Sequence, residues 1–187
     1  MKIRFFSLLI VALIAMSNVF ATSNLGKPEF IAAFTEANKL MEEKFWDQAA
    51  KEWRNVLAMD PENININYKL GLCYLQSSSE KNKTVFHLEK AVKQVTHNYL
   101  PEDVTEKRAS DFALYSLAEA YRLHYNFTAS NFYFNKFKDL VGTKNRELTS
   151  EIEKELNINI NADEFTKDTA KVVVTNLGDK VNSIFPE

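Results

Sequence analysis

Apolar residues recur every three or four positions through most of the chain between residues 28 and 156. This spacing puts apolar side chains on one face of a helix and predicts a succession of amphipathic helices. The stretches that show it are 29–44, a segment from Ala49 that stops at Asp60-Pro61, 64–76, 84–95, two segments around 117–121 and 130–137, and 144–156. The chain has only four glycines and four prolines, which favours long helices and an all-α fold.

The helical pattern is interrupted once and then ends. Residues 97–108 contain Pro101 and a run of charges between two helical stretches, so we expect an inserted loop there. Beyond residue 156 the pattern changes, and residues 171–175 form a β-branched run typical of a strand. The sequence therefore predicts an extended tail over residues 157–187.

A repeat is visible inside the helical region at a fixed offset of 34 residues. Small residues Ala37 and Gly71 are separated by this offset, and so are Leu40 and Tyr74. Self-similarity at this period is typical of units of two helices that stack on one another to bury their apolar faces. A third unit, which contains Leu117, follows at a longer spacing that accommodates the inserted loop.

The repeated positions resemble those of the tetratricopeptide repeat family over roughly residues 28–140. The family's small residue of the first helix is matched by Ala37, Gly71 and Ala118, and its aromatic residue at the bend by Trp46 and Phe127. In the second helix, the small residue is matched by Ala49 and Ser130, and the large aromatic residue by Trp53 and Phe134. Proline at the end of a unit is matched only by Pro61. The resemblance implies a tetratricopeptide solenoid of about three repeats, whose activity is binding.

The tail at residues 172–186 resembles a linker in exported Bacteroidetes proteins. In that family, tetratricopeptide repeats precede a WD-type propeller and an OmpA-like peptidoglycan-binding domain, and some members belong to type IX secretion and gliding. This chain stops at Glu187, where the propeller would begin. It is therefore expected to be either a fragment of a longer protein or a shortened form, and peptidoglycan would be bound only through a domain that is absent here.

The first residues have the features of a cleavable export signal. Lys2 and Arg4 precede an apolar run from Phe5 to Met16, and residues 19–21 offer a cleavage site after Ala21. The run of about 12 residues is shorter than the roughly 20 needed to span a bilayer. We expect a soluble protein of the periplasm that can associate with the outer membrane. The expected parts of the chain are a signal peptide at 1–21, a repeat domain at 28–156 and a tail at 157–187.

Charge and cysteine content narrow the range of functions. The formal net charge is −2, and a chain without a basic excess is a poor partner for nucleic acid. Cys73 is the only cysteine, which excludes an intrachain disulfide. Because Cys73 lies between Leu72 and Tyr74 in an apolar helix, we expect it to be a core residue.

The resemblance also suggests which residues would line a binding groove. Positions on the concave face of such arrays are Phe34, Asn38, Met41, Tyr68, Leu72, Leu75, Tyr115, Glu119 and Arg122. Only Asn38 and Arg122 fit the carboxylate clamp known in the family, so an apolar and aromatic groove is the better expectation. The alternative, that Leu72 and Leu75 pack against the next unit, stays open at this stage.

No pattern of catalytic, metal-binding or cofactor-binding residues is evident. The three histidines share no metal-ligand spacing, and Glu151, Glu153 and Glu155 are expected to form a charged helix face. We therefore predict no catalytic residues, no metal and no cofactor, and a protein that is not an enzyme. Thr169 lies in a three-residue stretch that resembles the Bacteroidetes O-glycosylation acceptor.

The function expected from the sequence is a non-catalytic adaptor of the bacterial cell envelope. Its partners would be proteins of a secretion, gliding or outer-membrane assembly. A structural spacer, or a truncated fragment of a peptidoglycan-anchored OmpA-like protein, is the first alternative. An accessory for glycan uptake or for an envelope enzyme is a weaker one.

Overall fold

The computed structural model describes residues 26–142 and 145–167, and these residues are mostly α-helical. The predicted all-α class is thus confirmed for this part of the chain. The elements are α2 (Pro28–Glu42), α3 (Trp46–Met59), α4 (Ile64–Gln76), a short 3₁₀ helix (Lys81–Lys83), α5 (Thr84–Ala91), β1 (Val95–Thr96), β2 (Ala109–Ser110), α6 (Ala113–Leu123), α7 (Phe127–Val141) and α8 (Arg146–Lys167). None of the described helices is both long and apolar enough to cross a membrane.

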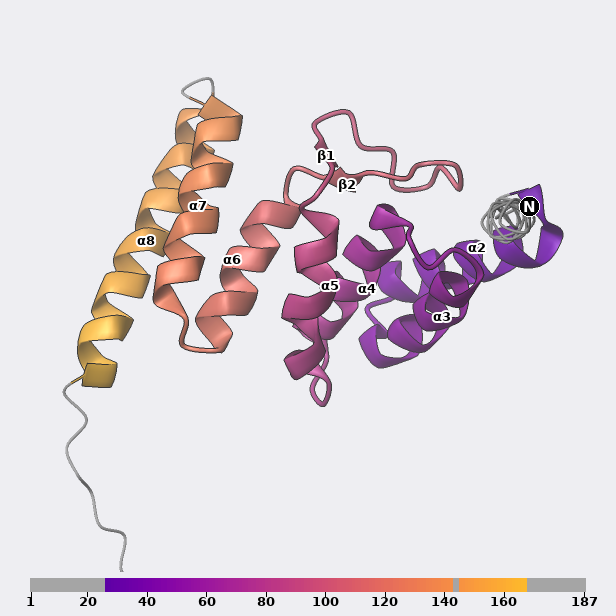
Figure 1. The fold of residues 1–187 in the computed structure, drawn as a ribbon, viewed down its shortest axis with the longest axis horizontal. Coiled ribbons are helices and arrows are strands. Elements are labelled where there is room, and N and C mark those ends of the chain that lie inside the picture. The colour runs from indigo at the N-terminus through magenta and orange to yellow at the C-terminus, as the bar shows by residue number, and fades with distance from the viewer. Residues whose placement is uncertain (1–25, 143–144, 168–187) are drawn as a thin grey trace, which may run out of the picture.

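The helices form a row in which each one packs on its neighbours in the sequence. Contacts run from α2 to α3, from α3 to α4 and onward to α8, and α4 also touches α6. Figure 1 shows this row, with α2 at one end and α8 at the other. Because each helix contacts mainly its neighbours, the core extends along the row.

Local sequence signals set several helix ends. Pro28 opens α2, where its missing N–H costs nothing. The side chains of Asn63 and Asn126 accept hydrogen bonds from Ile66 N and Ala129 N, which caps α4 and α7. Gly142 ends α7 with a φ of 61°, a conformation that favours glycine.

Three groups of buried side chains fill the row. In the first, Trp53 is fully buried and its ring meets Phe34 edge-on, with the ring centroids 5.1 Å apart. The second joins α4, α5 and α6, and there Gly71 allows a close approach, because a Cβ at this position would lie 2.6 Å from Leu88 Cδ2. The third joins α6, α7 and α8 around Phe134. Cys73 is fully buried in the first group, as predicted.

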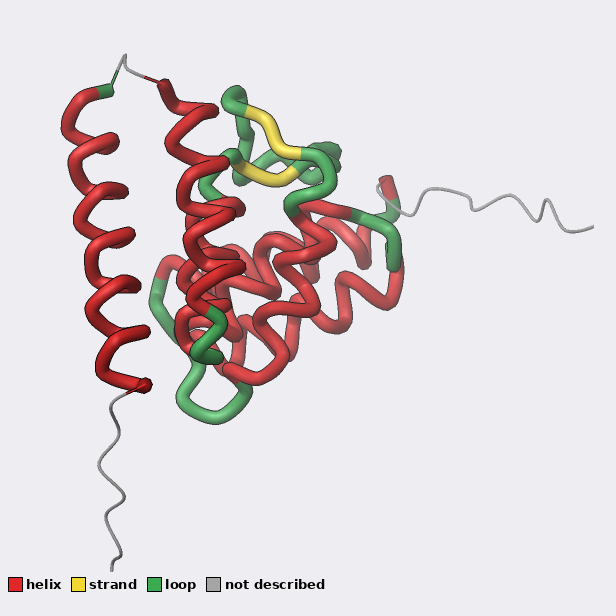
Figure 2. Tube along the Cα trace, turned by 60° about the vertical axis from the view of Figure 1, so that its left-hand side comes forward, coloured by secondary structure: helices red, strands yellow, loops and turns green. Residues whose placement is uncertain are grey.

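The predicted insertion forms a loop over residues 92–112, between α5 and α6. Within it β1 and β2 pair in parallel, with Val95 opposite Ala109. Figure 2 shows the two strands side by side at one edge of the helical row. The loop therefore folds back on itself, and the residues between its two strands contact α4.

Two predicted boundaries are wrong. The helix predicted over 84–95 ends at Ala91, because Val95 pairs with Ala109 in the loop. The helix predicted to end at residue 156 continues to Lys167, so residues 157–167 are not part of an extended tail. Asn159 explains this continuation, since its buried amide donates to Ser130 Oγ at 2.7 Å and anchors the second half of α8 on α7.

Several sequence predictions fall on residues that the structure does not describe. These are the signal peptide with its cleavage after Ala21, the strand and turn pattern of residues 171–186, and the modification at Thr169. They stay predictions. The extended tail likewise stays a prediction for residues 168–187 alone.

Candidate functional site

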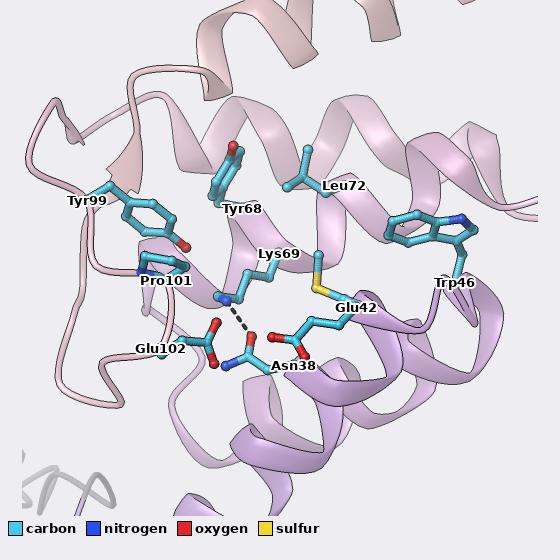
Figure 3. Close-up of a pocket in the computed structure, with 10 residues that line it drawn as sticks. Asn38, Glu42, Trp46, Tyr68, Lys69, Leu72, Tyr99, Pro101 and Glu102 are labelled. Carbon is cyan, nitrogen blue, oxygen red and sulfur yellow. Dashed lines mark hydrogen bonds between the residues drawn. The ribbon is translucent and has the colours of Figure 1, made fainter.

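A hollow of about 280 Å³ lies between α2, the start of α3, α4 and the 92–112 loop. We call it the pocket. The residues that line it are Asn38, Met41, Glu42, Trp46, Tyr68, Lys69, Leu72, Tyr99, Pro101 and Glu102. Figure 3 shows aromatic and apolar side chains around one buried cation and two carboxylates. Three segments that are far apart in the sequence thus build one cavity.

Lys69 supplies the cation at the base of the pocket. Its residue is only 4% exposed, and its Nζ donates a hydrogen bond to Asn38 Oδ1. The same Nζ lies 5.2 Å from the ring centroid of Trp53 and 5.5 Å from that of Phe34. Aromatic faces attract a cation, so these two core rings support the ammonium group from behind.

Burial and nearby charges act on Lys69 in opposite directions. Burial lowers its pKa from 10.5 to about 8, against the opposing influence of Glu102, Cys73 and Glu42. Among the described residues, no carboxylate lies within the 4.0 Å of Nζ that would make an ion pair. In Figure 3 the carboxylates of Glu102 and Glu42 lie on either side of the Lys69–Asn38 hydrogen bond. Lys69 is therefore a buried ammonium at neutral pH, near two carboxylates but not directly paired with either.

The wall from the 92–112 loop is held in place by α4. Tyr99 packs edge-on against Tyr68, with ring centroids 5.7 Å apart, and its hydroxyl donates to Asn65 Oδ1 at 2.6 Å. Asn65 Nδ2 donates to the carbonyl of Glu106 at 3.2 Å, and Asn65 N donates to the carbonyl of Lys107 at 3.1 Å. A single buried asparagine thus fixes the loop that closes one side of the pocket.

The structure brings together four of the predicted groove residues and separates the other five. Asn38, Met41, Tyr68 and Leu72 line the pocket. Phe34 and Leu75 do not line it. Phe34 is 2% exposed against Trp53, and Leu75 is 7% exposed in the second core group, so the groove prediction is wrong for both because they are core residues.

The remaining predicted groove residues lie on α6 and are half-buried. Tyr115 packs against Phe134 and Phe137 of α7, with ring centroids 5.1 and 5.8 Å away. Arg122 forms an ion pair with Glu155 of α8. For Glu119, also on α6, burial is the main cause of a raised carboxyl pKa. These three residues do not line the pocket, so the structure does not join them with α2 and α4 in one cavity, and their part in a groove stays a prediction.

More than half of the residues that line the pocket were not predicted from the sequence. The residues missed are Glu42, Trp46 as a wall residue, Lys69, Tyr99, Pro101 and Glu102. One signal was present, because Lys69 is the only charged residue in the helix at 64–76. No local signal could have placed Tyr99 or Glu102 there, since their position depends on how the loop docks on α4.

Two other buried titratable groups, Cys73 and His87, have structural surroundings that do not favour reactivity. Burial raises the pKa of the Cys73 thiol to about 12, which disfavours the reactive thiolate. His87 Nδ1 lies 3.0 Å from Asn67 Oδ1, and burial lowers its pKa to about 4. Within residues 26–142 and 145–167, no three His, Cys, Asp or Glu residues are placed to hold a metal ion.

Two of the three glutamates predicted to form a charged face of the last helix make ion pairs with earlier helices. Glu153 pairs with Lys138 of α7 at 2.8 Å, while Glu155 pairs with Arg122 of α6. Glu151 and Glu153 are exposed, as expected for a charged helix face, whereas Glu155 is half-buried. Glu153 and Glu155 fasten α8 to the two helices before it.

The pocket therefore provides groups for binding: apolar and aromatic walls, one ammonium donor and two carboxylate acceptors. Neither a known protein-family model nor a curated protein matches the chain. What the site does must consequently be argued from its own geometry and charges. Sites with mostly apolar walls and a few fixed polar groups are typical of ligand and peptide recognition.

Proposed function

We propose that the protein is a non-catalytic binding module that holds a short segment of a protein partner in the pocket between α2, α4 and the 92–112 loop. The observation that carries this proposal is the pocket itself, with Met41, Trp46 and Leu72 exposing apolar surface beside the polar groups of Asn38 and Lys69. Such a mixture suits a peptide, whose side chains need apolar contacts and whose backbone needs hydrogen-bond partners.

We further propose that the helix pairs are tetratricopeptide repeats. In support, the small residues Ala37, Gly71 and Ala118 are fully buried or line a close helix contact. The large aromatics of the second helices, Trp53 and Phe134, are likewise fully buried. In this interpretation α8 packs on α7 as the first helix of a following unit would.

The proposed setting is the bacterial cell envelope, where the protein would be an adaptor of a secretion, gliding or outer-membrane assembly. This part of the proposal rests on the export-signal pattern of residues 1–21 and on the resemblance of residues 172–186 to the linker of exported proteins. The periplasmic location and the protein partner follow from the same two features.

A structural spacer is a second candidate, and one observation favours it. The 92–112 loop docks on α4 through Asn65 and Tyr99 and so already occupies part of the face on which the pocket lies. In a spacer, this loop would be the permanent occupant of that face. The repeats would then only set a distance between other parts of an assembly.

A selection from a displayed library of random 12-residue peptides tests the binding proposal. We expect enriched peptides whose affinity falls about tenfold in Trp46→Ala, because truncating an aromatic wall residue removes a typical interface anchor. Phe45→Ala is the matched control, since Phe45 is adjacent, 52% exposed and outside the pocket. Equal affinity in both variants, or no enrichment by a protein with intact helical circular dichroism, would overturn the binding proposal and favour the spacer.

A further inference from the structure

The carboxylates of the pocket outnumber its cation. Glu42 from α2 and Glu102 from the 92–112 loop line the same cavity as Lys69. Both are exposed residues, and among the described ion pairs neither glutamate has a cationic partner. At neutral pH the pocket therefore carries two negative charges against one positive charge. Its field attracts a cationic group and repels an additional carboxylate.

The ammonium of Lys69 already donates one hydrogen bond within the protein and still has N–H donors for a ligand. An ammonium group has three N–H donors, and Asn38 Oδ1 is the acceptor in the hydrogen bond that the structure shows. Because Glu42 and Glu102 stand beside it, an anionic ligand would have to approach two like charges. A neutral backbone carbonyl of a bound segment meets the spare donors without that repulsion.

The walls favour the same kind of ligand. Trp46, Tyr68 and Tyr99 surround the charged groups with aromatic surface, on which a guanidinium group stacks well. Leu72 and Pro101 add apolar surface for a neighbouring side chain. A volume of about 280 Å³ is below the roughly 300–1,000 Å³ of sites for drug-sized ligands, so one or two side chains fill it.

From these observations we infer that the pocket recognises a basic side chain, with an apolar side chain next to it, in an internal segment of the partner. The basic group pairs with the carboxylate of Glu42 or Glu102, and a backbone carbonyl of the segment accepts a hydrogen bond from Lys69. This inference rests on the proposed peptide-binding function. It adds the chemistry of the bound residue and assigns no role to a terminal carboxylate.

An array of hexapeptides with both ends blocked provides the test. The peptides have alanine at the outer four positions, and the two central positions sample all twenty residues. We expect the strongest signals from pairs of an apolar residue and arginine or lysine. In titrations of the best arginine peptide, replacement of arginine by neutral citrulline should weaken binding about fivefold, and replacement by glutamate should weaken it further.

Two carboxamide variants and one control assign this preference to the pocket. Glu42→Gln and Glu102→Gln should each reduce the arginine-to-citrulline ratio, and the double variant should bring it close to one. Glu43→Gln is the control, because Glu43 is exposed, adjacent to Glu42 and outside the pocket. It should leave the ratio unchanged.

The outcomes separate this inference from the function on which it rests. A glutamate peptide that binds more tightly, or a ratio that Glu42→Gln and Glu102→Gln leave unchanged, overturns the inference. If library-selected peptides need Trp46 but carry no basic residue, the inference fails while the binding function stands. If neither the array nor the library yields a peptide that depends on Trp46, both fail.

Discussion

The helices α4 and α6 both present polar and aromatic side chains on predicted groove positions, but their surroundings differ. On α4, Tyr68 and Leu72 line a cavity, with Lys69 at its base. On α6, Tyr115 packs against α7, and Arg122 is paired with Glu155 of α8. Within the described residues, one surface retains space and an ammonium that has no ion-pair partner, whereas side chains of α7 and α8 pack against the other.

The two cations show what this difference means physically. Lys69 is buried beside carboxylates but outside ion-pair distance, and its lowered pKa records the cost of burial. Arg122 also lies over the ring of Phe134 at 5.5 Å, but Glu155 neutralises it. Burying a charge without a direct partner lowers the stability of the fold. Such charges are therefore found more often at binding sites than at purely structural positions.

The largest expected effect concerns the core behind the pocket. Trp53→Ala should lower the free energy of unfolding by about 3–5 kcal/mol, because it leaves a cavity in a fully buried site. It also removes one of the rings that support Lys69. Urea unfolding followed by circular dichroism measures the loss. Phe165→Ala, at a 78% exposed position of α8, is the control and should stay within about 0.5 kcal/mol of the parent.

The next effect concerns the loop that closes the pocket. Asn65→Ala should cost about 1–3 kcal/mol, since Tyr99 and the Glu106 carbonyl lose a buried partner. Amide hydrogen exchange should rise over residues 99–107 and stay unchanged in α8. Asn55→Ala removes only an exposed contact with Glu52 and should change neither quantity. If exchange over 99–107 is unaffected, Asn65 does not hold the loop.

Replacing Lys69 should change the free energy of unfolding in the opposite direction. Lys69→Met should raise the free energy of unfolding by about 1–3 kcal/mol at pH 7, because it removes a buried ammonium without a direct carboxylate partner. In the parent protein the unfolded chain binds this proton more tightly than the folded one, with pKa values of 10.5 and about 8. Lys69 therefore adds stability as pH rises from about 8 toward 10.5.

The variant tests this assignment across the same pH range. Lys69→Met should lack the rise in stability that Lys69 contributes between pH 8 and 10.5. The groups that face Lys69 are Glu42 from α2, Cys73 on its own helix and Glu102 from the loop. Burial raises the pKa of Cys73 to about 12, above this range. Matching pH profiles in parent and variant would show that Lys69 is not the group responsible.

The smallest effect concerns the covered surface on α6. A double-mutant cycle with Arg122→Gln and Glu155→Gln should give a coupling of about 1 kcal/mol, because both side chains are largely shielded from water, at 22% and 18% exposure. The exposed pair Lys167–Asp163 within α8 is the comparison and should give about 0.3–0.5 kcal/mol. Equal couplings would mean that α8 does not shield the α6 surface.

The sequence was informative where structure follows local periodicity and less so where it depends on distant contacts. The helix at 64–76 was predicted with its observed bounds, because Asn63 caps one end and serines follow the other. The second half of α8 was missed because it is anchored by an amide, Asn159, and not by an apolar residue. When a polar residue is buried against a polar partner, the apolar periodicity of the sequence does not reveal it.

The same distinction applies to the site. Tyr68 and Leu72, which the family resemblance placed on the concave face, do line the pocket. The charges that give the pocket its preference were missed, since Glu102 reaches it only through a loop that docks on Asn65. Tyr115 does not line the pocket, because its ring packs against α7, and the sequence does not reveal which neighbour packs on a helix face.

The most direct test of the account is a map of where a peptide binds. In a titration of ¹⁵N-labelled protein with the best end-blocked arginine peptide, we predict amide shifts at residues 38–46, 68–72 and 99–102. Residues 115–122 of α6, which α7 and α8 cover, should remain unchanged. Shifts centred on residues 115–122, or shifts that persist unchanged in Trp46→Ala, would contradict the claim that the pocket on α2 and α4 is the binding site.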